Sequence, residues 1–197
     1  GFIGNAPNLD IKNFNIKNAL QKRISLPVFI DNDVNLATLG IQRFGYAKNA
    51  VNALVVFVGT GIGSGLIINK KLYRGSTNFA GEIGHIVIDE NGPLCGCGKK
   101  GCFEAFASRK SITRNIESDM SKNKKTVITK LVKKGEPIKS KTLAKAVAQG
   151  DKLVIRHVEQ GCHTIGRVLA GIANMLNLDM IILGGGMIEA LESFMMP

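Results

Sequence analysis

One histidine and three cysteines in a glycine-rich segment constrain the fold of this chain more than any other feature. The four residues are His85, Cys95, Cys97 and Cys102, so three of the four cysteines in the 197-residue chain fall within eight positions. One imidazole and three thiolates complete the tetrahedral shell that zinc takes in structural sites. The glycines interspersed among the cysteines let the backbone turn tightly enough for the sulfurs to face a single ion.

The alternative to a metal is a set of buried free thiols or a disulfide bond. A disulfide would leave one unpaired cysteine in the cluster and would give no role to His85 upstream. Zinc held by four protein ligands has no open position for water, so the spacing predicts a structural ion.

The residues around the cluster carry a family resemblance. Segment 82–104 contains E-x-G-H followed by C-x-C-G-x-x-G-C-x-E, which is similar to the signature of the ROK family of repressors and sugar kinases. The resemblance extends to the N-D-x-N motif at 32–35, the glycine loop at 59–65 and the L-G-G-G run at 183–186. It therefore covers most of the chain, and its bacterial glucokinase-like members are the nearest likeness.

This resemblance implies an α/β protein with the actin-like ATPase (ribonuclease H-like) fold of sugar kinases, which has two lobes with a cleft between them. Residues 1–31 would be a remnant of the N-terminal lobe, and residues 32–197 would form most of the C-terminal lobe, with the zinc loop at 81–104. The chain begins without Met and stops just after the start of a helix. We therefore expect a fragment that lacks an N-terminal segment and some C-terminal helices and is inactive alone.

Hydrophobic patterning agrees with an α/β fold. Apolar runs predict strands at 26–30, 53–58, 66–68 and 180–183, with a glycine turn over 59–65. Helical spacing predicts a helix that ends before Gly45, a short helix over 142–149, a long helix over about 153–176 and a last helix from 188.

The Asn32-Asp33 pair is the candidate catalytic motif. Asp33 follows a predicted strand, where a carboxylate can project into a cleft. By resemblance, Asp33 is the base that accepts the proton of the sugar 6-hydroxyl, and Asn32 binds neighbouring hydroxyls. Taken alone, the pair favours a cap on the following helix. Asp31 stands where the family motif usually has Glu.

Two glycine clusters are the candidate nucleotide-binding loops. The residues predicted to contact ATP are Gly59, Thr60, Gly61, Gly63, Gly184, Gly185 and Gly186. The first cluster is neither a Walker loop nor a G-x-G-x-x-G motif, and by itself it would be an ordinary hairpin. By resemblance it is the second phosphate loop of the family, and the triple glycine is the turn beside the adenosine.

The zinc loop also carries the residues expected to recognise the sugar. By resemblance, Glu82, His85 and Glu104 surround the sugar hydroxyls. A neutral imidazole can bind zinc through one nitrogen and donate the other N–H to a hydroxyl. The alternative for the two glutamates is ordinary surface charge.

The resemblance implies ATP-dependent phosphorylation of a hexose at its 6-hydroxyl, with glucose as the first candidate. The expected cofactors are Mg²⁺ with ATP and a structural Zn²⁺, and the expected assembly is a homodimer or a higher homo-oligomer. The alternatives are a ROK-family transcriptional repressor and a sugar-binding regulator without turnover. Glucose, N-acetylglucosamine, N-acetylmannosamine and fructose are not distinguished.

The net charge of +11 raises the question of nucleic-acid binding. Residues 109–145 hold twelve Lys or Arg and three Asp or Glu, a net charge of +9 in one stretch. That stretch has no Tyr or Trp to stack on bases, so it predicts a solvated helical face and no nucleic-acid site. No apolar run is long enough for a membrane span. The free thiols favour the cytoplasm.

Overall fold

The computed structural model of the protein describes residues 1–6, 11–133 and 135–196. The strands are β1 (Phe2–Ala6), β2 (Ile11–Asn15), β3 (Ala53–Val58), β4 (Ile62–Ile68), β5 (Lys71–Tyr73) and β6 (Met180–Gly184). The helices are α1 (Ile16–Gln21), α2 (Asp33–Phe44), α3 (Glu104–Ala107), α4 (Arg109–Ser121), α5 (Ile128–Leu131), α6 (Ser140–Ala148), α7 (Lys152–Leu176) and α8 (Gly186–Met195), together with the 3-10 helix η1 (Ile83–His85).

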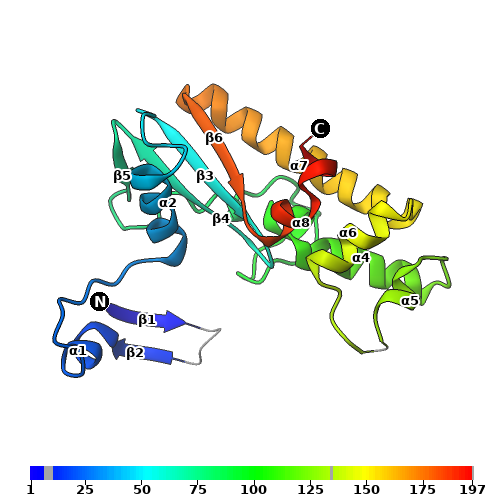
Figure 1. Ribbon diagram of the computed structural model, residues 1–197, viewed down its shortest axis with the longest axis horizontal. Coiled ribbons are helices and arrows are strands. Elements are labelled where there is room, and N and C mark those ends of the chain that lie inside the picture. Colours follow the sequence, from blue (N-terminus) through cyan, green and yellow to red (C-terminus); the bar gives the residue numbers. More distant parts are fainter. Residues whose placement is uncertain (7–10, 134, 197) are drawn as a thin grey trace.

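A mixed sheet forms the centre of the main body, with strand order β5-β4-β3-β6 (Figure 1). β3 pairs antiparallel with β4 and parallel with β6, so the carboxyl ends of β3 and β6 lie side by side. β3 is buried along almost its whole length. Its unbroken apolar run is typical of a strand that is covered on both faces.

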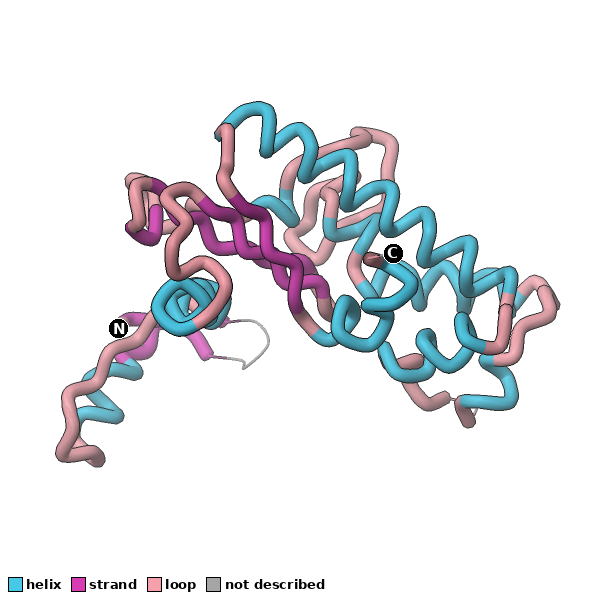
Figure 2. Tube along the Cα trace, turned by 45° about the horizontal axis from the view of Figure 1, so that its top comes forward, coloured by secondary structure: helices cyan, strands magenta, loops and turns pink. Residues whose placement is uncertain are grey.

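The two faces of the sheet are covered by different helices (Figure 2). Leu54, Val56 and Val58 alternate along β3 and pack in the main core with apolar residues of α4, α6, α7 and α8. Ala53 and Ile67 belong to a smaller cluster on the opposite face, where Ile41 of α2 packs against them. The long helix α7 is amphipathic, and it covers the first face with its buried residues Val154, Val158, Ile165 and Leu169.

Helix α2 packs closely on β4 because two positions of that strand are glycine. A Cβ at Gly63 would lie 2.9 Å from Val34 Cγ2, and a Cβ at Gly65 would clash with the Thr38 side chain. The prediction of a turn over 59–65 is therefore wrong beyond Gly61. β4 begins at Ile62, and the later glycines serve the contact between helix and strand.

An N-terminal unit of β1, β2 and α1 lies apart from the main body, and residues 22–32 join the two (Figures 1 and 2). β1 and β2 form an antiparallel hairpin that the sequence analysis did not predict. The predicted strand at 26–30 is wrong. Pro27 has no N–H to donate, and within the described part of the chain no strand pairs with this segment, in which Leu26 is 70% and Phe29 83% exposed.

The predicted helices at 142–149 and 153–176 and the strand at 53–58 are observed with shifts of at most two residues. The basic stretch is a solvated face on one side only, because Ile112, Ile116 and Leu143 are buried in the main core. Among the described helices, none is both long enough and apolar enough to cross a bilayer.

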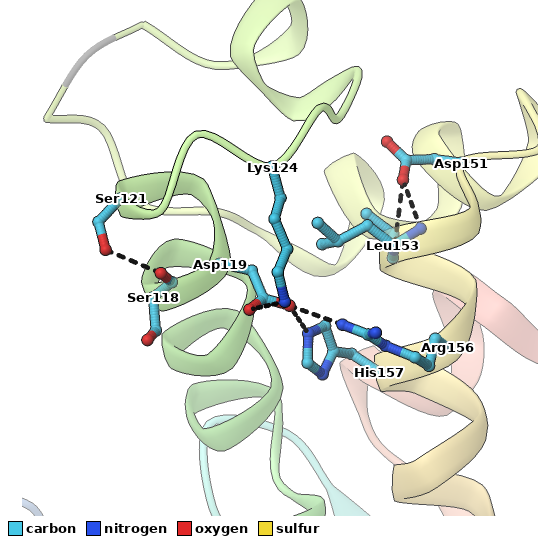
Figure 3. Close-up of polar contacts among 9 residues, drawn as sticks. Ser118, Asp119, Ser121, Lys124, Asp151, Leu153, Arg156 and His157 are labelled. Atoms are coloured by element: carbon cyan, nitrogen blue, oxygen red, sulfur yellow. Dashed lines mark hydrogen bonds and ion pairs between the residues drawn. The ribbon is translucent and has the colours of Figure 1, made fainter.

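A buried carboxylate ties α4 to α7 (Figure 3). Asp119 accepts hydrogen bonds from Lys124 Nζ at 2.7 Å, Arg156 Nη2 at 2.7 Å and His157 Nε2 at 3.0 Å. His157 Nδ1 is buried and has no hydrogen-bond partner in the described part of the chain, so the imidazole proton belongs on Nε2, facing the carboxylate. Hydrogen bonds from Lys124 and His157 lower the pKa of Asp119 to about 2.

We expect Asp119→Asn to destabilise the fold, because an amide presents its own N–H groups to three donors. The wild-type carboxylate stabilises the fold above its ordinary pKa of 3.8, and this contribution is lost as the pH falls through about 2. Urea midpoints at pH 7 and pH 3 should differ less in the variant than in the wild type. Glu117→Gln, on the exposed side of the same helix, should behave as wild type; an unchanged midpoint for Asp119→Asn at pH 7 would contradict this role.

Candidate functional site

The structure brings the four predicted metal ligands together. The ligand atoms of His85, Cys95, Cys97 and Cys102 all lie within 4.8 Å of one another. Cys97 Sγ lies 3.7 Å from Cys102 Sγ, and Cys95 Sγ lies 3.7 Å from His85 Nδ1. In a zinc tetrahedron with bonds of about 2.3 Å, neighbouring sulfurs lie about 3.8 Å apart, whereas a disulfide needs about 2.05 Å. The donor types and spacing therefore fit zinc.

The three thiols of the cluster differ in how readily they lose a proton. Burial raises the pKa of Cys102 to about 12 and also raises the pKa of Cys95. The backbone N–H of Lys99 instead lowers the pKa of the exposed Cys97 thiol. Zinc binding here must displace protons from buried thiols, which ties metal binding to the folded loop.

The zinc loop is anchored in the main core near its two ends, by Ile83 and Phe103. Its buried cluster consists of Cys95, Cys102 and Ala105, separate from the main core. Backbone hydrogen bonds from Phe103 to Ile86 and from Ile88 to Gly101 hold its two sides together. Between these two anchors few apolar side chains are buried, so we expect the order of this segment to depend on the metal ligands.

The three residues predicted to read the sugar lie around this cluster. His85 turns Nδ1 toward Cys95, which leaves Nε2 on the other side, 4.0 Å from Glu82 Oε2. Glu104 Oε1 lies 3.8 Å from Cys95 Sγ, and its Oε2 accepts a hydrogen bond from the Ile62 N–H at 2.8 Å. Glu104 therefore links the zinc loop to the first residue of β4, a contact that the sequence analysis did not foresee.

Strand β4 connects this loop to the Asn32-Asp33 motif. Val34 contacts β4 at Gly63, while Gly84 of η1 lies against Ile62. Asn32 caps α2, because its Oδ1 accepts from the N–H groups of Val34 and Asn35. Among the described residues, no acceptor contacts the Asn32 amide NH₂, so it can donate to a ligand. The exposed Asp33 is the first helical residue, and its Oδ1 accepts the N–H of Val34.

An ion pair anchors the start of α2. Arg74 Nη2 lies 2.5 Å from Asp31 Oδ2, and Asp31 Oδ1 accepts the N–H of Asn32 at 2.8 Å. The hydrogen bond from Arg74 is the main cause of the lowered pKa of Asp31. Asp31 therefore helps to position the Asn32-Asp33 motif at the start of α2. It occupies the position at which the family motif usually has the longer Glu.

The two glycine clusters meet at the carboxyl ends of β3 and β6. Phe57 of β3 is in register with Gly184 of β6. Gly185 has a φ of +93°, and a Cβ there would lie 2.8 Å from Val58 O, so only glycine fits this turn. Open α/β sheets bind ligands at the carboxyl ends of parallel strands.

Helix α8 starts at this point. Gly185 is its N-cap and has no side chain that could cap the first N–H groups. Uncapped N–H groups at a helix start carry a partial positive charge that suits a phosphate.

One residue at this edge, Arg109, was not among the predicted site residues. Arg109 Nη2 donates to Thr60 Oγ1 at 2.6 Å, and the Arg109 N–H donates to Gly59 O at 2.9 Å. From its sequence context, Arg109 was expected to belong to the solvated basic stretch. Thr60 and Arg109 are 49 residues apart in the sequence, so no local pattern indicated their contact.

The comparisons with known proteins agree on one family. The sequence matches the model of the ROK family over residues 1–195. A glucokinase from Halalkalibacterium halodurans is 35% identical over 198 residues, which cover 100% of this chain and 60% of that protein. A xylose repressor from Bacillus subtilis is 43% identical over 116 residues, which cover 59% of this chain and 30% of that protein. The chain thus spans about 60% of the length of the matched glucokinase.

Solved structures share the fold. A ROK family glucokinase from Streptomyces griseus in complex with glucose and AMPPNP superposes with a TM-score of 0.82 at 29% identity, covering 100% of this chain and 68% of that one. A ROK family transcriptional regulator, a homologue of the E. coli MLC protein, gives a TM-score of 0.85 at 27% identity, covering 98% of this chain and 48% of that one. The predicted actin-like fold of ROK sugar kinases is confirmed.

Proposed function

This chain belongs to the ROK family, and on that premise we propose that the full-length protein transfers the γ-phosphoryl group of ATP to the 6-hydroxyl of a hexose, with glucose as the first candidate. The matched glucokinase supports sugar phosphorylation. Because the chain covers only part of that relative, the activity is assigned to the whole protein, and the 197 residues alone are expected to be inactive.

The observation that carries this proposal is the meeting of the two glycine turns at one edge of the sheet. The turn at 59–61 follows β3, and the turn at 184–186 follows β6 and starts α8. In our proposal the first turn, with the Thr60 hydroxyl, faces the phosphates, and the second lies beside the adenosine. Gly63 supports this site indirectly, because it lies in β4 under α2.

The proposed chemical step needs one base. Asp33 accepts the proton of the 6-hydroxyl, and the oxygen then forms a bond to the γ-phosphorus. The bond between that phosphorus and the bridging oxygen breaks, and ADP leaves with the electron pair. Bound Mg²⁺ would neutralise charge on the phosphate oxygens.

The proposed sugar site lies between α2 and the zinc loop. The Asn32 amide donates to one hydroxyl, His85 Nε2–H donates to another, and Glu82 and Glu104 accept from adjacent hydroxyls. Zinc would hold these side chains in register from its four protein ligands and would take no part in the reaction. The four candidate hexoses are glucose, N-acetylglucosamine, N-acetylmannosamine and fructose.

We also propose a cytoplasmic homodimer or higher homo-oligomer. All four cysteines are free, as expected in a reducing compartment. The outward-facing side of the basic stretch at 109–145 is proposed to be solvated and to have no nucleic-acid role.

We expect Glu104→Gln to weaken hexose binding much more than ATP binding. A charge-assisted hydrogen bond contributes about 1.5–3 kcal/mol, while the amide can still accept from the Ile62 N–H and keep β4 in place. Calorimetric titration of the hexose and of ATP would separate the two effects. Glu90→Gln, an exposed change in the same loop, serves as the control, and equal losses for both substrates would instead indicate a folding role.

The second candidate is a sugar-responsive regulator without turnover. It is favoured by the 43% identity with a xylose repressor over 116 residues. Titration of Mg²⁺-ATP into the full-length protein separates the two candidates. Saturable binding in the micromolar to millimolar range supports the kinase, whereas sugar binding without ATP binding supports the regulator.

A further inference from the structure

Arg109 contacts the first glycine turn through both its backbone and its side chain. Its backbone N–H and its guanidinium contact consecutive residues of the first turn, Gly59 and Thr60. Arg109 is partly buried, and its hydrogen bond to the Thr60 hydroxyl places the guanidinium against the turn. A guanidinium has five N–H donors, and the contact to Thr60 uses one nitrogen. Donors therefore remain for another acceptor at this point.

The positive charge of Arg109 lies at the start of α4, where a cation is unfavourable. α4 begins with Arg109 and Lys110 and has no acidic residue in its first turn. The start of a helix is its positive end, so two cations there are electrostatically unfavourable. None of the ion pairs in residues 1–6, 11–133 and 135–196 involves Arg109. A bound anion would compensate the guanidinium and the dipole of α4 together.

We propose that Arg109 is a phosphate-binding residue that contacts the terminal phosphates of the nucleotide beside Thr60. The inference rests on the proposed ATP-dependent function and adds a recognition residue to it. A planar guanidinium can bind two phosphate oxygens at once, which a lysine cannot do. Its contact with Thr60 holds the guanidinium at the turn before the nucleotide arrives, so less side-chain entropy is lost on binding.

The test uses the full-length protein with Arg109→Ala, Arg109→Lys and the neighbouring control Lys110→Ala. Mg²⁺-ATP, adenosine and glucose are titrated separately by calorimetry. We expect Arg109→Ala to weaken Mg²⁺-ATP binding by ~10–100-fold, the ratio for a lost charge-assisted hydrogen bond. Adenosine and glucose binding should be unchanged. Arg109→Lys should restore part of the affinity, and Lys110→Ala should match the wild type.

Three results would overturn the inference. Wild-type affinity of Arg109→Ala for Mg²⁺-ATP would remove Arg109 from the site but leave the proposed function standing. Equal losses for adenosine and Mg²⁺-ATP would mean that Arg109 only supports the turn. A wild-type protein that binds glucose but no Mg²⁺-ATP would reject the proposed function as well as this inference.

Discussion

Replacement of Asp33 by Asn in the full-length protein is expected to lower turnover by ~10²–10⁴-fold, the range for loss of a general base. Hexose binding should persist, because the amide keeps an oxygen that accepts the Val34 N–H, as Asp33 Oδ1 does at 2.9 Å. The helix should persist too, because its cap is Asn32. Steady-state kinetics combined with calorimetric titration of the hexose would measure both effects.

A matched control for Asp33 is Glu159→Gln, which removes a carboxylate from the exposed side of α7. Its turnover should equal that of the wild type. Near-wild-type turnover of Asp33→Asn would leave Asp33 with no role beyond the first turn of α2, and the base would have to be sought elsewhere.

Loss of one zinc ligand is the second change with a large expected effect. Cys95→Ser should abolish stoichiometric zinc and with it most of the hexose affinity, because His85 and Glu104 both lie against Cys95. Structural zinc sites bind with apparent free energies of about 10–16 kcal/mol, far more than the small apolar cluster of this loop can supply. Metal analysis of protein purified without added zinc, followed by hexose titration, would measure the outcome.

Cys162 provides the control for this experiment. It is the fourth cysteine, half-buried in α7 and outside the cluster, so Cys162→Ser should retain zinc and hexose binding. Wild-type protein without zinc, or Cys95→Ser with unchanged zinc content, would contradict the metal site.

The metal cluster could be predicted from the sequence because its four ligands lie in one short segment. Local glycine turns bring them together, and no distant part of the chain has to be placed first. Arg109 could not be found in this way, because Thr60 lies 49 residues before it and the contact depends on how α4 docks on β3. The link between Glu104 and Ile62 spans 42 residues and was missed for the same reason.

The elements of the fold also divide into those that local patterns predict and those that depend on distant contacts. The strand at 53–58 and the long helix α7 follow from unbroken apolar runs and regular spacing. The glycines of β4 were misread as part of a turn, because their role is set by α2 on the neighbouring layer. Residues 26–30 do not form the expected strand. A strand needs a neighbouring strand to pair with, and apolar composition alone does not supply one.

The most direct test of the proposed function is phosphorus NMR of the full-length protein with Mg²⁺-ATP and each of the four candidate hexoses. We expect a hexose 6-phosphate resonance to grow as the γ-phosphate of ATP declines, with one hexose preferred, and Asp33→Asn to suppress it. A zinc-loaded protein that binds a hexose yet produces no sugar phosphate from any of the four would contradict the kinase and favour the regulator.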